Sequence, residues 1–157
     1  MNVSELREEI KFGLENLERV YLRIEKFVSQ EIDIHFKTSA LAYECLGYYN
    51  ALEHLILRIF KYLGVAKPSG PFFHRDILKI FEKLVRESGI ECEESLFNAI
   101  EDLMAFRHVA TKIYGFLLDW DKLKFVISEI ETYHGKIRQF FLAILETLEA
   151  GELQKSR

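Results

Sequence analysis

Apolar residues recur every three or four positions along most of this chain, which is the period of one face of an α-helix. The first such stretch covers residues 4–32 and begins at Ser4, a residue type that often caps helices. Its apolar positions are Leu6, Ile10, Leu14, Leu17, Tyr21, Ile24 and Val28. This spacing predicts a long amphipathic helix, followed by a polar break at residues 33–38.

The second predicted helix, residues 39–63, has a wider apolar face than the first. Two adjacent apolar lines run along it, formed by Leu41, Cys45, Tyr48, Leu52, Leu55 and Ile59 and by Leu46, Tyr49, Ile56 and Phe60. A face of this width indicates contact with several neighbouring helices. Gly64 is expected to end the helix, and a Pro- and Gly-containing loop at residues 67–71 leads to a short third helix at residues 74–87.

Two further helices are predicted at residues 93–114 and 119–150. The apolar line of the fourth helix contains an arginine and consists of Leu96, Ile100, Leu103, Arg107, Ala110 and Tyr114. Four long helices, one short helix and no strand signal predict an all-α, up-and-down four-helix bundle with an additional short helix. We expect a single domain over residues 1–150 and a flexible tail at residues 151–157.

Composition and charge restrict the possible surroundings and partners of this bundle. The net charge of −4, from 25 acidic and 21 basic residues, excludes a global basic surface for nucleic acid, so any contact with RNA must be local. The chain shows no signal peptide and no apolar run that could span a membrane, so we expect a cytoplasmic protein. Cys45 and Cys92 suit a reducing compartment as small buried residues without a disulfide.

The end of the fourth predicted helix carries a cluster of polar residues: Arg107, His108, Lys112 and Tyr114. A guanidinium on an apolar line must be paired or must face a cleft. One interpretation is structural, with Arg107 paired to a carboxylate that fixes helix packing. The other is catalytic: Arg107 and Lys112 bind phosphate, His108 transfers protons near neutral pH, and the phenol of Tyr114 donates a hydrogen bond or accepts a group.

The same residues resemble a family motif. The sequence Arg-His-Val-Ala-Thr-Lys-Ile-Tyr at residues 107–114 resembles the Arg-x4-His-x-Tyr motif of HepT-like HEPN proteins. Residues 48–54, Tyr-Tyr-Asn-Ala-Leu-Glu-His, and residues 73–78, Phe-His-Arg-Asp-Ile-Leu, are similar to family segments in the same order. The resemblance covers about residues 40–123.

The resemblance implies a helical bundle that dimerises so that two motifs line one cleft, where RNA is cleaved without a metal ion. Such proteins act as toxins in toxin-antitoxin pairs. The partner is usually a minimal nucleotidyltransferase antitoxin that modifies the motif tyrosine, which is Tyr114 in this chain. On this basis we expect a homodimer, a nucleotidyltransferase partner and RNA as ligand, with no cofactor and no membrane contact.

Lys112 occupies the position of the motif histidine. An ordinary lysine is protonated at neutral pH, so it neutralises phosphate but is a poor general base. Burial or a cationic neighbour such as Arg107 can lower a lysine pKa, which is one route to catalytic lysines. His108 is the other candidate for proton transfer, although it lies about 100° from Arg107 around the helix.

Glu53 and His74 are the candidate supporting residues. Glu53 interrupts an apolar line of the second helix, where a carboxylate needs a cationic partner, and Arg107 and Arg58 are the candidates. A structural ion pair is favoured over a catalytic role. His74 follows the loop at residues 67–71 and is expected to be structural or to lie at the rim of the cleft.

Glu131 and His134 match half of the Glu-x-x-His pattern of di-iron bundles. Such bundles need this spacing on two helices with further inward glutamates, and the chain has it once, displaced from the apolar line of the fifth helix. We therefore interpret the match as chance on a solvated face and expect no metal site. No Gly-rich phosphate loop or convincing serine or cysteine triad is found.

These observations leave three hypotheses. The first is a HepT-like toxin that cleaves RNA, with Arg107 stabilising the transition state and Lys112 or His108 handling charge and protons. The second is a catalytically degenerate relative that binds a nucleotidyltransferase or RNA without cleaving it, which Lys112 favours. The third is a bundle with an unrelated interaction role.

Overall fold

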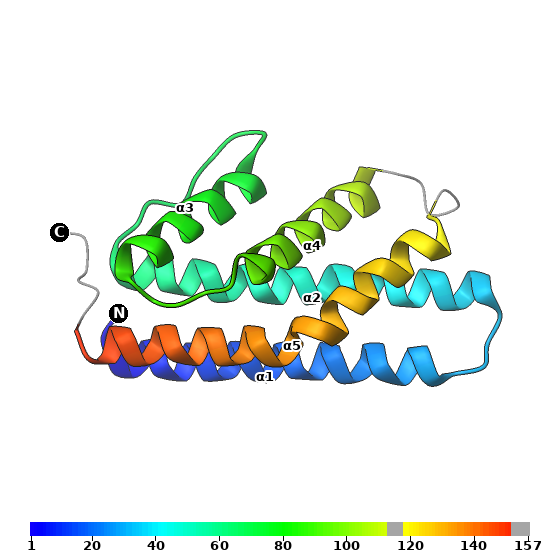
Figure 1. Ribbon diagram of the computed structural model, residues 1–157, viewed down its shortest axis with the longest axis horizontal. Coiled ribbons are helices and arrows are strands. Elements are labelled where there is room, and N and C mark those ends of the chain that lie inside the picture. The colour runs from blue at the N-terminus through cyan, green and yellow to red at the C-terminus, as the bar shows by residue number, and fades with distance from the viewer. Residues whose placement is uncertain (113–117, 152–157) are drawn as a thin grey trace.

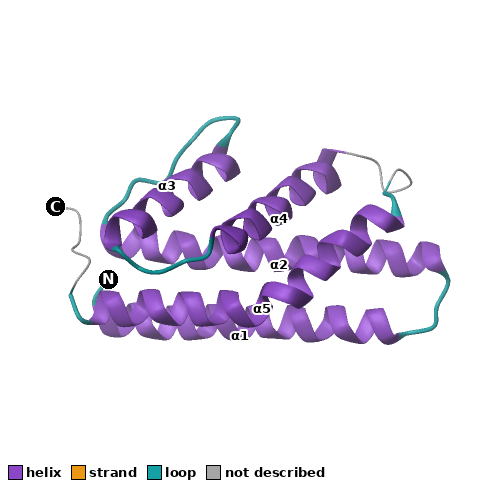
Figure 2. Cartoon of the chain, in the orientation of Figure 1, coloured by secondary structure: helices purple, strands orange, loops and turns teal. Residues whose placement is uncertain are grey.

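The computed structural model describes residues 1–112 and 118–151, and within them the chain folds into five α-helices without a strand (Figures 1 and 2). The helices are α1 (Val3–Ser29), α2 (Ile34–Leu63), α3 (Phe73–Ser88), α4 (Glu94–Lys112) and α5 (Trp120–Glu149). The long helices α1, α2, α4 and α5 alternate in direction, and the short α3 lies beside α4 and packs on α2. The predicted all-α bundle is confirmed.

The first two helices form an antiparallel hairpin whose ends differ from the prediction. Asn2, not Ser4, caps α1, because its side-chain oxygen accepts a hydrogen bond of 2.8 Å from the backbone N–H of Glu5. The polar break is also shorter than predicted, since α2 begins at Ile34 with Asp33 as its cap. The hydroxyl of Thr38 then donates a hydrogen bond to the carbonyl of Ile34. Most of the predicted polar break therefore lies inside the first turns of α2.

The predicted apolar lines form the core. Both lines of α2 are buried except for the half-buried Leu46, and Tyr48 and Tyr49 are fully enclosed. An aromatic cluster joins α3 and α4 to α5 and contains Phe81, Phe97, Phe140 and Phe141. Burial raises the pKa of the Cys45 thiol to about 12, so Cys45 acts as a small apolar core residue.

His134 corrects the interpretation of the Glu131-x-x-His134 spacing. Its side chain is buried rather than solvated, with Nδ1 at 2.9 Å from the Tyr48 hydroxyl and Nε2 hydrogen-bonded to Glu18. Tyr21, predicted to be in the core, is half-buried and stacks on the His134 ring with centroids 4.0 Å apart. His134 thus ties α5 to α1 and α2. No group of metal-ligating side chains occurs in the described part of the chain.

Three other expectations concern the ends and surroundings of the bundle. In the described residues no helix is long and apolar enough to cross a membrane. Cys45 is buried as predicted, whereas Cys92 is only half-buried, and both thiols are free. Apart from Gly151, the expected tail at residues 151–157 lies outside the described residues, as does Tyr114.

Candidate functional site

The three segments with family resemblance meet where α3 and α4 pack against the middle of α2. Glu53 of α2 is buried, and its Oε2 accepts hydrogen bonds from the Tyr49 hydroxyl at 2.9 Å and from Nδ1 of His74 at 2.7 Å. His74 lies in the first turn of α3, so this contact fixes the start of α3 on α2. Glu53 is therefore held by hydrogen bonds from Tyr49 and His74, and not by either of the arginines expected as its partner.

Neither arginine proposed as the partner of Glu53 reaches it. Arg58 extends toward α1, where its Nε lies 3.6 Å from Oε2 of Glu9. Arg107 lies close enough for its charge to act on Tyr49. Burial, followed by the charge of Glu53, raises the pKa of the Tyr49 phenol well above its usual range, and Arg107 opposes this only in part. Tyr49 is therefore a protonated hydrogen-bond donor at any physiological pH.

Arg107 is half-buried on α4, and its Nε lies 3.3 Å from the side-chain oxygen of Asn50 on α2. Within residues 1–112 and 118–151, no carboxylate forms an ion pair with Arg107. The expected carboxylate partner of Arg107 is therefore absent among these residues, and Asn50 takes its place in the contact between α4 and α2. A guanidinium held by a neutral amide keeps its positive charge and has N–H groups left to donate to an anion.

His108 and Lys112 do not converge with Arg107. Both side chains are exposed. At about 100° per residue, Lys112 points about 140° away from Arg107 around the helix. Arg107 faces α2 while the other two face solvent, so the predicted cluster at the helix end is divided between two faces of α4. A single protomer does not direct these groups at one phosphorus atom.

A family model described as HepT-like protein matches residues 40–148, which is more than half of the chain and runs from the first turns of α2 almost to the end of α5. The chain belongs to the HepT-like family. The comparison with curated proteins and the comparison with solved structures found no match. Family membership supports a HEPN-type domain of the toxin and ribonuclease-related class.

The sequence analysis did not identify two residues of this candidate site. Asn50 positions the guanidinium of Arg107, and Tyr49 shares the carboxylate oxygen of Glu53 with His74. Both lie in the segment 48–54 that carries the family resemblance. Asn50 is exposed, and a polar residue on the exposed face of a helix has no sequence feature that would mark it as a partner of Arg107. Its role depends on how α4 lies across α2.

Proposed function

We propose that this HepT-like protein is the toxin of a toxin-antitoxin pair and that its dimer cleaves RNA without a metal ion. The observation that supports this most is Arg107, whose guanidinium is held by Asn50 and has no carboxylate partner among the described residues. An arginine kept in this state suits an anion that binds from outside the chain. The phosphodiester of RNA is such an anion.

The proposed reaction is an attack of the ribose 2′ oxygen on the adjacent phosphorus. The new P–O2′ bond forms, the P–O5′ bond breaks, and a 2′,3′-cyclic phosphate remains on one fragment. Arg107 stabilises the charge that accumulates on the phosphoryl oxygens in the transition state. His108 accepts the proton of the 2′ hydroxyl, and the ammonium of Lys112 binds the phosphate and protonates the departing 5′ oxygen.

The proposed dimer would reunite the groups that diverge within one protomer. Phe36, Tyr43 and Asn50 follow one another at intervals of seven residues, which places them on one face of α2. Phe36 is 74% and Tyr43 72% exposed. This aromatic face runs directly to the contact between Asn50 and Arg107, so a second copy that covers it would bring its own α4 to the same cleft.

We expect the purified protein to have the mass of a dimer in light scattering at micromolar concentration. Changing Tyr43 to glutamate should shift the mass toward that of a monomer, because the charge would be buried in the apolar interface. The matched control is Phe72→Glu, which changes another exposed aromatic residue at the start of α3 and should leave the mass unchanged. A monomer mass for the wild type would contradict the proposed dimer.

The proposed partner is a minimal nucleotidyltransferase antitoxin that modifies Tyr114. This residue lies outside the described part of the chain, and the motif at residues 107–114 is what supports the proposal. Mixing the two proteins with a nucleoside triphosphate should increase the mass of the toxin by a nucleotide. The increase should be absent when Tyr114 is changed to phenylalanine. An active antitoxin that leaves the mass unchanged would count against the partnership.

The exposure of Lys112 favours a second candidate function, in which the protein binds RNA or its partner without cleaving RNA. An ordinary solvated ammonium holds its proton firmly near neutral pH, so it is a poor general acid for the departing 5′ oxygen. In this case the cleft would retain its affinity for phosphate through Arg107 and Lys112. Only the chemical step would be lost.

Changing Lys112 to histidine separates these two functions. If the wild type is a ribonuclease, the imidazole should raise its cleavage rate in EDTA by at least about tenfold, because positioned acid-base groups contribute at least that much. The measurement is the rate of cleavage of a structured RNA by both proteins. A wild type that binds but never cleaves, together with an active histidine variant, would refute the enzyme proposal and support the binding function.

A further inference from the structure

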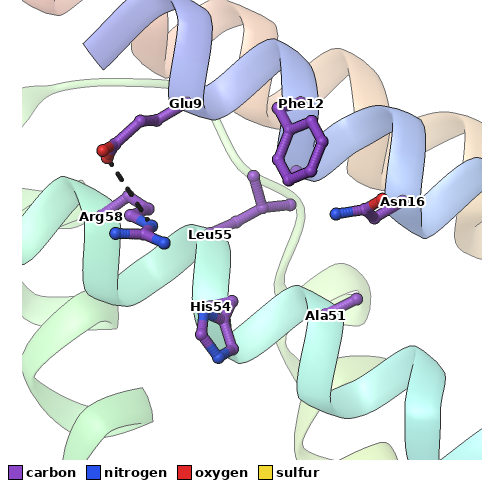
Figure 3. A pocket seen from close by; sticks show the side chains of 8 residues that line it. Glu9, Phe12, Asn16, Ala51, His54, Leu55 and Arg58 are labelled. Carbon is purple, nitrogen blue, oxygen red and sulfur yellow. Dashed lines mark ion pairs between the residues drawn. The ribbon is translucent and has the colours of Figure 1, made fainter. Parts of the chain in front are cut away.

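A second polar pocket lies between α1 and α2, one helical turn along α2 from Asn50. Glu9, Phe12 and Asn16 extend into this pocket from α1, and His54 and Arg58 line it from α2 (Figure 3). The helices can approach closely here because Gly13 has no side chain: a Cβ at this position would lie 2.5 Å from Cδ2 of Leu55. The pocket holds about 270 Å³, just below the range of about 300–1,000 Å³ that is usual for ligand sites.

The charges of the pocket largely cancel. Nε of Arg58 lies 3.6 Å from Oε2 of Glu9, within ion-pair range but too far for a hydrogen bond. This carboxylate oxygen has no hydrogen-bond partner among the described residues. The side chain of Glu9 is 34% exposed, so the carboxylate can turn toward a ligand. A neutral ligand that offers N–H groups fits this site better than a second phosphate does.

The pocket also has an aromatic ring available for stacking. Phe12 is 61% exposed although it is a large apolar side chain. The amide of Asn16, which can both donate and accept a hydrogen bond, lies one helical turn further along α1. An exposed aromatic face beside hydrogen-bonding side chains is how proteins recognise an unstacked base of single-stranded RNA.

We propose that this pocket binds one unpaired base of the RNA substrate, stacked on Phe12, and that Glu9 selects guanine. Guanine offers two adjacent N–H donors to a carboxylate, whereas uracil offers one N–H and no amino group. The inference rests on the proposed ribonuclease function, since it assigns a specificity subsite to the same RNA. The base on Phe12 would lie close to the phosphodiester held by Arg107.

The position of the pocket on α2 supports this assignment. Asn50, which holds Arg107, and His54, which lines the pocket, are four residues apart and both exposed. At 1.5 Å per residue they are about 6 Å apart along the helix axis. They lie on the same face of α2, and α2 packs against both α1 and α4. An RNA strand crossing this face would reach both sites within a nucleotide or two.

The test measures binding of fluorescently labelled uridine oligonucleotides with a single central guanosine or with none. Their sugars carry 2′-fluoro groups and therefore lack the attacking hydroxyl. The wild type should prefer the guanosine-containing strand, and Phe12→Ala should weaken its binding about tenfold through the lost stacking. Glu9→Gln should abolish the preference for guanosine. Phe125→Ala, which removes a similarly exposed ring from α5, should change neither property.

Equal affinity of the wild type for both strands, or equal effects of Phe12→Ala and Phe125→Ala, would overturn the subsite. Tight binding of free guanosine monophosphate would assign the pocket to a nucleotide ligand instead of RNA, and would also overturn it. The subsite and the proposed function can fail separately. Cleavage that depends on Arg107 but not on Phe12 refutes only the subsite, whereas guanosine-selective binding without cleavage refutes only the enzyme.

Discussion

Replacing Arg107 by alanine should lower the rate of RNA cleavage at least about 100-fold, the loss typical when one preorganised donor to a transition-state charge is removed. Among the described residues of the proposed mechanism, only Arg107 has a side chain that is held by another helix, through its contact with Asn50 of α2. His108 and Lys112 are exposed and keep their positions in the variant. The measurement is the initial rate of cleavage of a labelled structured RNA in EDTA.

Three further variants show whether this loss is specific. Arg107→Lys should recover part of the rate, since it restores charge but not the planar set of donors. Asn50→Ala should reduce the rate less than Arg107→Ala, because it frees the guanidinium without removing it. Arg75→Ala removes an exposed arginine of α3 that lies over Phe72, and it should leave the rate unchanged. Similar losses for Arg75 and Arg107 would indicate only a general charge effect.

Replacing Glu53 by alanine should lower the free energy of unfolding by about 3 kcal/mol, because it removes a buried side chain that accepts two hydrogen bonds. The change would leave the buried Tyr49 hydroxyl without its acceptor and would release His74 at the start of α3. An unsatisfied buried hydroxyl alone costs about 1–3 kcal/mol. Urea unfolding at neutral pH measures the loss.

Two control variants separate the role of this carboxylate from side-chain loss in general. Glu53→Gln keeps an acceptor oxygen in nearly the same place, so it should lower the free energy of unfolding clearly less than Glu53→Ala does. Glu15→Ala removes an exposed glutamate of α1, and its effect should stay within about 0.5 kcal/mol. If Glu53→Ala were as mild as Glu15→Ala, the contacts of Glu53 with Tyr49 and His74 would contribute nothing to stability.

The helices could be predicted from sequence because each long helix buries one face, and burial imposes the period of the helix on the apolar residues. The prediction was less accurate where local polar chemistry sets a boundary. Asp33 and Thr38 look like a loop in the sequence, yet they form hydrogen bonds that cap and continue the start of α2. Residues of these types serve turns and helix ends equally well.

His134 shows what periodicity cannot detect. Its position beside the apolar line and its neighbour Glu131 suggested a solvated face. Burial depends on Tyr48 and Glu18, which come from other helices and satisfy both ring nitrogens. A histidine with two partners can be buried at little cost, and no spacing within α5 shows where those partners are.

The candidate site could be predicted in part. An arginine on an apolar line predicts a side chain that is paired or faces a cleft, and Arg107 does contact Asn50 of α2. The resemblance to the family motif is what makes it a candidate for the site. Its partner Asn50 and the contact of Glu53 with His74 depend on the register between α2 and the helices packed on it. Both arginines were plausible partners of Glu53 by charge, and only the packing directs Arg58 toward Glu9.

The central claim, that this HepT-like protein cleaves RNA without a metal ion, is tested most directly by the products formed in EDTA. Wild-type protein and Arg107→Ala protein are incubated with the same structured RNA, and the ends of the fragments are analysed. We expect the wild type to produce fragments ending in 2′,3′-cyclic phosphate and the variant to produce almost none. Intact RNA with the wild type, or fragments that appear equally with Arg107→Ala, would contradict the claim.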